Sequence, residues 1–233
     1  MIKLTERLQK IADFVPAGAR VADIGTDHGF IPIYLAANGI SDYVIAGDIN
    51  SGPLEKMRGN LDRILGGCPD SIKMRRGSGF DVFSAGEVDT VVIAGMGGRL
   101  MTEIFEADIE KTMALTMMVL QPRKEQAGLR KWLFDNGFDV YDGRLVRESR
   151  FVWEIMAVRR ATAETSRPSQ YEVNEAILRR KDPLLPKFIE NRVGLLQRIY
   201  DEALKSDSAE SAERRRELKK DIDGLMEIYN GFQ

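Results

Sequence analysis

The stretch that decides the fold is residues 20–30, Arg-Val-Ala-Asp-Ile-Gly-Thr-Asp-His-Gly-Phe. Its first half is apolar apart from Asp23, which favours a short buried strand. Gly25 and Gly29 then mark a tight turn, and residues 30–37 carry apolar side chains at helical spacing. A strand, a glycine loop and a helix in this order indicate the first crossover of an open α/β sheet. Nucleotides bind such sheets at the carboxyl ends of the strands.

The glycine loop lacks the pattern that binds a dinucleotide. That pattern is Gly-x-Gly-x-x-Gly, whereas this loop reads Gly-Thr-Asp-His-Gly. Asp23 and Asp27 bracket the loop, and their negative charges would repel a pyrophosphate. A cationic ligand fits better, and S-adenosylmethionine carries a sulfonium and an ammonium but no phosphate. Asp-x-Gly-x-x-x-Gly after a buried strand resembles motif I of the Rossmann-like methyltransferases; an ordinary glycine turn is the alternative.

The length and composition limit the class of protein. With 233 residues, the chain is long enough for one large domain or a domain with an appendage. We find no apolar run that would span a bilayer and no signal-peptide pattern, so we expect a cytoplasmic protein that does not contact membranes. Its one cysteine, Cys68, excludes an internal disulfide. With His28 as the one histidine, we expect no metal site.

The charge distribution argues against an indiscriminate nucleic-acid binder. The net charge of −2 gives no overall basic field. Affinity for phosphate nevertheless depends on where lysines and arginines lie, so a locally basic face is compatible with this total. Most clusters are expected to be solvated surface. The basic clusters are Arg75-Arg76, Arg123-Lys124, Arg130-Lys131, Arg144 with Arg147 and Arg150, Arg179-Arg180-Lys181 and Arg214-Arg215-Arg216.

Two further stretches predict strands that end at candidate ligand contacts. Residues 43–48 end in Asp48, roughly 20 residues beyond the loop, where such folds hold a ribose diol. The alternative is that Asp48 caps the next helix. Residues 71–76 form a weaker strand, followed by Gly77-Ser78-Gly79, whose backbone can approach an adenine ring closely or form a plain turn.

Residues 88–94 are the clearest buried strand, and they run into Gly95-Met96-Gly97-Gly98, where the backbone must pass close to another group. Other elements are expected up to residue 161: helices at residues 4–14, 53–65 and 99–107 and one opened by Pro122, and strands at residues 116–121, 138–146 and 152–158. Seven strands with an antiparallel last pair match the α/β sheet of the Rossmann-like class I methyltransferases.

The composition changes after residue 161, and we expect a catalytic domain at residues 1–161 and a linker at residues 162–169. Residues 170–233 are expected to form a helical arm. Helical stretches at residues 171–204 and 209–229 carry apolar stripes, which predict a helical hairpin or coiled coil. Pro183 and Pro186 are expected to interrupt the first stretch. The arm could grip tRNA, dimerise or cap the domain.

The chain resembles the bacterial tRNA (adenine-22, N1) methyltransferase family over its whole length. The shared motifs are Asp-Ile-Gly-Thr-Asp-His-Gly-Phe-Ile-Pro at residues 23–32, Ile-Ala-Gly-Met-Gly-Gly at residues 93–98 and Leu-Gln-Pro at residues 120–122. The resemblance implies S-adenosylmethionine as cofactor, N1 of adenine 22 in the D-arm of tRNA as methyl acceptor, and a carboxyl-terminal coiled-coil arm. We expect a monomer or a weak homodimer.

The resemblance also implies cofactor contacts. The methionine part would lie near Asp23, Gly25 and His28, the ribose on Asp48, and the adenine near Ser78 and Gly79. The implied set further includes Thr26, Ile49 and Gly95. The family usually has Asp or Asn where this chain has Ser78, so the contact to the adenine amino group differs.

The target base would lie between Phe30 and the loop of Gly95, Met96, Gly97 and Gly98. The family commonly has Tyr at the position of Phe30, so stacking is retained and a phenol hydrogen bond is lost. Adenine N1 carries a lone pair and no proton, so His28 is not needed as a general base. We expect Asp27 to stabilise the positive charge of the methylated base; the alternative is that Asp27 only fixes the loop.

Three other functions remain open at this point. The first is a methyltransferase of the same fold that acts on another RNA, a protein or a small molecule. The second is a non-catalytic nucleotide-binding module whose arm recruits partners. The third is a nicotinamide oxidoreductase, which the acidic loop and the missing third glycine disfavour.

Overall fold

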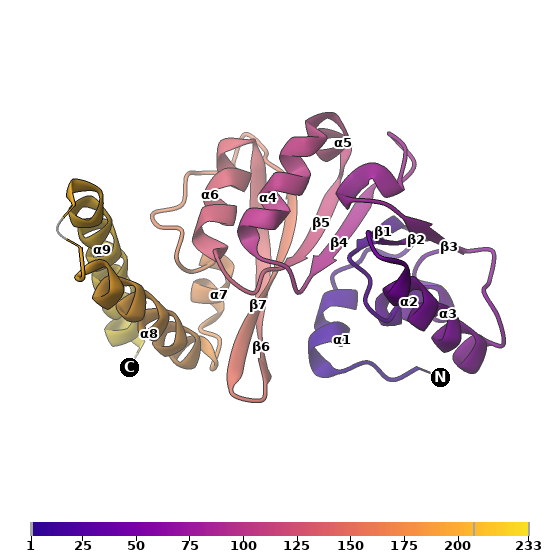
Figure 1. The fold of residues 1–233 in the computed structure, drawn as a ribbon, viewed down its shortest axis with the longest axis horizontal. Coiled ribbons are helices and arrows are strands. Elements are labelled where there is room, and N and C mark those ends of the chain that lie inside the picture. Colours follow the sequence, from indigo (N-terminus) through magenta and orange to yellow (C-terminus); the bar gives the residue numbers. More distant parts are fainter. Residues whose placement is uncertain (1, 207, 233) are drawn as a thin grey trace.

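The computed structural model describes residues 2–206 and 208–232 and contains a seven-stranded sheet in the order β3-β2-β1-β4-β5-β7-β6 (Figure 1). Strand β7 runs antiparallel to its neighbours β5 and β6, and the other pairs are parallel. This confirms the predicted fold class. The strands are β1 (Arg20–Ile24), β2 (Tyr43–Asp48), β3 (Ile72–Arg76), β4 (Thr90–Ala94), β5 (Met117–Gln121), β6 (Phe138–Glu148) and β7 (Phe151–Arg160).

Helices cover both faces of the sheet (Figure 1). One face carries α1 (Glu6–Ala12), α2 (Phe30–Ala37) and α3 (Ser51–Leu65), and the other carries α4 (Gly98–Ala107), α5 (Ile109–Ala114) and α6 (Gln126–Asp135). A 3₁₀ helix, η1 (Gly79–Val82), follows β3.

Alternate residues of the central strands face opposite layers of the core. In β4, Val91 and Ile93 belong to the apolar cluster beneath α4 and α6, whereas Val92 belongs to the cluster beneath α1 and α2. Both faces of each inner strand are therefore covered. This explains why these strands read as continuous apolar runs in the sequence.

The helix after β5 differs from the prediction. Pro122 does not open it; α6 begins at Gln126, and Glu125 takes a left-handed conformation at φ 60°. The intervening segment is held by the glycine loop after β4, because Arg123 N–H donates to Met96 O at 2.8 Å and Gly98 N–H donates to Lys124 O at 2.8 Å. These bonds replace the first turn of the expected helix. Helix α5 was not predicted.

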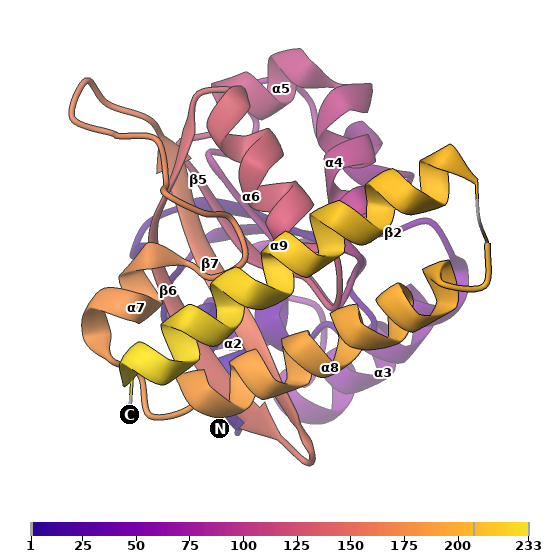
Figure 2. The same ribbon diagram turned by 90° about the vertical axis from the view of Figure 1, so that its left-hand side faces the viewer.

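The carboxyl-terminal arm consists of α7 (Glu175–Arg180), α8 (Leu185–Ala203) and α9 (Ala209–Phe232). Figure 2 shows α8 and α9 as an antiparallel pair lying across one end of the sheet. The predicted first stretch is two helices separated around Pro183, whereas Pro186 lies in the first turn of α8, where a proline is tolerated. Leu145 of β6 and Val152 of β7 share an apolar cluster with Leu196 of the arm.

Candidate active site

The loops after β1 to β4 meet at one edge of the sheet. Parallel strands bring their carboxyl ends together, and backbone hydrogen bonds join neighbouring loops. Gly25 N–H donates to Gly47 O at 2.8 Å, Gly77 N–H to Asp48 O at 3.0 Å, and Gly95 N–H to Gln121 O at 3.0 Å. The structure thus brings the predicted site residues that follow β1, β2, β3 and β4 to one continuous edge of the sheet.

A cavity of about 480 Å³ lies between the glycine loop of β1 and the amino-terminal segment. Seven of the predicted site residues line it: Asp23, Gly25, Thr26, Asp27, His28, Phe30 and Gly95. The other predicted residues, Asp48, Ile49, Ser78, Gly79, Met96, Gly97 and Gly98, do not line this cavity.

Asp23 is the most perturbed acid at the site. Its side chain lies at the floor of the loop and is only 6% exposed. Burial is the largest cause that raises the pKa of Asp23 from 3.8 to about 6; the nearby Thr26 hydroxyl opposes this rise, and the negative charge of Asp48 contributes to it. The neighbouring Thr26 Oγ1 is buried without a hydrogen-bond partner among the described residues. A buried carboxylate and an unpaired hydroxyl fit a ligand that carries a cationic donor group.

The backbone conformation at Gly25 favours glycine, because its φ is +76°. A Cβ there would also displace the terminal methyl group of Met96. Met96 therefore packs directly on the β1 loop. This contact joins the β1 loop to the β4 loop, and Met96 itself does not line the cavity.

Gly97 and Gly98 hold the β4 loop against the β5–α6 segment. Gly97 precedes α4, and a Cβ on Gly98 would collide with the backbone carbonyl of Glu125. The sequence predicted that the backbone at these glycines passes close to another group, and that group is the backbone of the β5–α6 segment. The proposed contact of Gly97 and Gly98 with a target base remains a prediction.

Asp27, His28 and Phe30 form the outer wall of the cavity. Asp27 is exposed, and its carboxylate oxygens lie 3.2 Å from His28 Nε2 and 3.5 Å from Lys56 Nζ. The His28 ring stacks on the Phe30 ring with centroids 5.5 Å apart and planes 16° apart. The half-buried Phe30 presents an aromatic surface to the cavity.

The remaining predicted cofactor contacts lie along the strand ends beyond this cavity. Asp48 Oδ1 accepts a hydrogen bond from Asn50 N–H at 2.8 Å, which closes a turn before α3. The N-cap residue of α3 is Asn50, so Asp48 does not cap this helix as the alternative role required. Ile49 is 58% exposed, an unusual position for an isoleucine and one suited to covering an apolar ring. Ser78 is exposed, and Gly79 has a φ of +50°.

Residues 4–156 match the family model described as "Methyltransferase domain". The chain belongs to this family. It is 29% identical over 235 residues to the tRNA (adenine(22)-N(1))-methyltransferase of Bacillus subtilis, and the match covers 98% of both chains. The crystal structure of the B. subtilis M1A22 tRNA methyltransferase TrmK is 27% identical, with a TM-score of 0.83 over 98% of this chain and 100% of that chain.

A second solved structure contains a ligand. The putative tRNA (m1A22) methyltransferase of Streptococcus pneumoniae in complex with S-adenosyl-L-methionine is 28% identical to this chain. Its TM-score is 0.79 over 97% of this chain and 100% of that chain.

The sequence did not predict the part of the cavity wall in this methyltransferase that the amino-terminal segment and Arg123 form. The amino-terminal segment contributes Lys3, Leu4, Thr5, Arg7 and Leu8, and Arg123 follows β5. Arg7 is held in place because its guanidinium lies 3.1 Å from Glu148 Oε2 and donates to Gln121 Oε1 at 3.2 Å. Arg123 belongs to one of the basic clusters, most of which were expected to be solvated surface.

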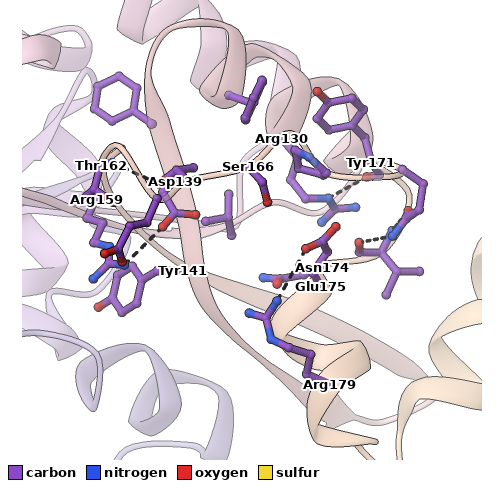
Figure 3. Close-up of a pocket in the computed structure, with 18 residues that line it drawn as sticks. Arg130, Asp139, Tyr141, Arg159, Thr162, Ser166, Tyr171, Asn174, Glu175 and Arg179 are labelled. Carbon is purple, nitrogen blue, oxygen red and sulfur yellow. Dashed lines mark hydrogen bonds and ion pairs between the residues drawn. The ribbon is translucent and has the colours of Figure 1, made fainter.

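A separate cavity of about 280 Å³ lies between β6 and the segment that follows β7 (Figure 3). Its arginines are paired, Arg159 with Asp139 at 3.4 Å and Arg179 with Glu175 at 3.6 Å. The guanidinium charges of these two arginines are therefore already balanced, and none of the predicted site residues lines this cavity. The described residues contain no group of three or more His, Cys, Asp or Glu side chains placed to bind a metal ion. Within the same residues, no helix combines the length and the apolar character that a membrane span requires.

Proposed function

We propose that this protein transfers a methyl group from S-adenosylmethionine to N1 of adenine 22 in the D-arm of tRNA. The observation that carries the proposal is the similarity to the B. subtilis tRNA (adenine(22)-N(1))-methyltransferase over 98% of both chains. The cavity at the β1 loop supports it, because Asp23 and Thr26 offer a buried carboxylate and an unpaired hydroxyl there.

The residues present fit S-adenosylmethionine. Asp23 and Thr26 would bind the ammonium of the methionine part, Asp48 the ribose hydroxyls, and Ile49, Ser78 and Gly79 the adenine. When bound, S-adenosylmethionine supplies an electrophilic methyl group on a positively charged sulfur. The exposed Ile49 side chain and the positive φ of Gly79 support the adenine assignment, since one provides an apolar cover and the other a close backbone.

The chain's own residues would orient the target base. Adenine N1 attacks with a neutral lone pair, so alignment and exclusion of water are the main requirements. The base must leave its stem, which costs a few kcal/mol. Phe30 would stack on the extruded base, and the Asp27 carboxylate would stabilise the positive charge that develops on it.

The proposal also covers the organisation of the protein. We assign residues 1–161 to the catalytic domain, residues 162–169 to a linker and residues 170–233 to the arm. We propose that the enzyme acts in the cytoplasm as a monomer or weak homodimer.

Methyl transfer from labelled S-adenosylmethionine tests the proposal directly. The substrates are an unmodified tRNA transcript with adenine at position 22 and a matched transcript with guanine there. We expect label on the first transcript alone. Equal label on both would move the target to another position. No label on either, with no cofactor binding by calorimetry, would reject an enzymatic function.

A further inference from the structure

The β6–β7 hairpin projects beyond the edge of the sheet that holds the active site (Figure 1). Leu120, the penultimate residue of β5, pairs with Met156 of β7. The first four residues of β7, Phe151 to Glu154, therefore extend past the end of β5, a length of roughly 13 Å at the rise of a strand. This overhang stands beside the catalytic cavity.

The hairpin and α8 enclose a groove of about 780 Å³. Figure 2 shows α8 lying across the hairpin strands, and β7 is in contact with α8. The groove is lined by six basic side chains and one acidic side chain. These are Arg123, Arg147, Arg150, Lys187, Arg192 and Arg198, and Glu190.

Four of the six basic side chains carry uncompensated charge. Lys187 pairs with Glu190 at 2.8 Å, and Arg192 pairs with Glu172 at 2.8 Å. Arg123, Arg147, Arg150 and Arg198 have no ion-pair partner in the ranges 2–206 and 208–232. Four arginines without ion-pair partners in one groove, on a chain with net charge −2, create a local positive field suited to a polyanion.

An aromatic surface accompanies these charges. Phe151 is 44% exposed, the Arg150 guanidinium carbon lies 5.0 Å from its ring centre, and the Trp153 ring lies 5.3 Å away. Trp153 also lines the groove, and its Nε1 is buried without an acceptor in the described part of the chain. An exposed ring beside an arginine is a surface on which unpaired RNA bases stack.

The groove and the catalytic cavity are neighbours with one lining residue in common. Arg123 lines both of them, and its guanidinium packs beside Gly95 of the β4 loop. The hairpin is fastened to the cavity wall by the ion pair between Arg7 and Glu148. A strand lying in the groove would thus reach the cavity at Arg123.

We propose that this groove binds the sugar-phosphate backbone of the RNA strand that carries the target adenine. Arg123, Arg147, Arg150 and Arg198 contact successive phosphates, and Phe151 stacks on an unpaired base of the same strand. This inference rests on the proposed function and adds to it the path by which RNA enters the site. The unpaired arginines together with the exposed ring favour RNA over an acidic peptide.

The test uses the full chain and a triple variant, Arg147→Ala, Arg150→Ala and Arg198→Ala, which leaves the active-site residue Arg123 in place. The matched control is Arg159→Ala with Arg179→Ala, two exposed arginines of the separate cavity (Figure 3). Fluorescence anisotropy measures the Kd for unmodified tRNA over a salt series, and calorimetry measures the Kd for S-adenosylmethionine.

The triple variant should bind tRNA about ten-fold or more weakly and should lose about two to three units of salt slope, close to one per lost phosphate contact. Its KM for tRNA should rise while kcat and cofactor affinity stay near wild type. The matched lysine triple variant should recover most of the affinity, and the control should behave as wild type.

An unchanged tRNA Kd and salt slope in the triple variant would overturn the groove proposal. If the wild-type protein binds poly-glutamate of matched charge as tightly as it binds tRNA, the groove binds acidic peptides and the RNA proposal is overturned. If the wild-type protein binds tRNA without methylating it, the proposed function is rejected, while the binding measurements still test the groove.

Phe151→Ala tests the stacking contact separately. It should weaken tRNA binding about five-fold without altering the salt slope, because no phosphate contact is removed. Phe151→Tyr should retain binding. Equal affinity of the alanine and tyrosine variants would refute stacking at this position.

Discussion

Arg130 of α6 and Glu154 of β7 form an ion pair whose side chains are only 5% and 0% exposed. The same guanidinium donates to the backbone carbonyls of Tyr171 and Glu172, each at 2.7 Å. One residue thereby joins a helix of the sheet layer, an antiparallel strand and the segment that leads into the arm. This arrangement couples the placement of the arm to the core of the sheet.

Arg130→Met should lower the free energy of unfolding by about 3–5 kcal/mol, because Glu154 is then left buried without a cation. Urea denaturation monitored by tryptophan fluorescence measures the change. Arg130→Met with Glu154→Gln should recover part of the loss, since the buried charge is gone. A single variant within about 1 kcal/mol of wild type would show that water reaches Glu154.

Asp23 should make stability depend on pH. Its pKa is 3.8 when solvated and about 6 in the folded protein. Between these pH values the folded state binds more protons than the unfolded state, so stability falls as the pH rises through this window. Asp23→Asn should raise stability by about 3 kcal/mol at neutral pH and by only about 1 kcal/mol near pH 4.5. Denaturation at both pH values checks this; an equal gain at both would contradict it.

Binding of S-adenosylmethionine should show the opposite preference. The ammonium group binds best to the ionised Asp23 carboxylate, so affinity should fall about ten-fold per pH unit below the pKa of about 6. Calorimetry between pH 5 and pH 8, in buffers of different ionisation enthalpy, measures both affinity and proton release. Asp23→Asn should bind more weakly and without this pH dependence.

Phe30→Ala should lower kcat/KM for tRNA about ten-fold or more, because a stacked base loses its platform. Phe30→Tyr should keep near-normal turnover, since the ring remains. The Kd for S-adenosylmethionine, measured in parallel, should change little in either variant. If Phe30→Ala turns over normally, the aromatic surface packs against the loop and does not receive the base.

Asp27→Asn should reduce kcat about ten-fold with little change in cofactor affinity, because the carboxylate opposes positive charge only on the methylated base. Lys56→Met is the matched control: it removes the ammonium 3.5 Å from Asp27 and leaves the carboxylate. Single-turnover kinetics measures both variants. Equal losses in the two would indicate that the Asp27–Lys56 pair only fixes the loop.

The sequence predicted the sheet because its signals are local. Residues 21–24 and 88–94 are apolar runs that end at glycines, and such runs form buried strands wherever both faces are covered. Gly25 could be recognised as a turn residue for the same reason, since its left-handed φ is a property of its own backbone. The predicted positions at four strand ends followed from the rule that parallel strands share one ligand-binding edge.

The sequence could not predict which groups face one another across that edge. The missing Cβ of Gly98 makes room for the Glu125 backbone, a contact that the sequence did not indicate, while its contact with a target base stays a prediction. Arg7 and Glu148 are 141 positions apart and meet only because α1 packs beside the β6–β7 hairpin. Such contacts depend on distances between segments remote in the chain, which hydrophobic periodicity does not encode.

The sequence by itself therefore determined the strands, the glycine turns and the acidic β1 loop, because each depends on neighbouring residues. The tertiary structure alone decided that Arg123, Arg147, Arg150 and Arg198 share one groove. It also decided that Asp23 is buried enough to hold its pKa at about 6. Charge pairing and desolvation are set by what packs around a group, and that is known only once the chain has folded.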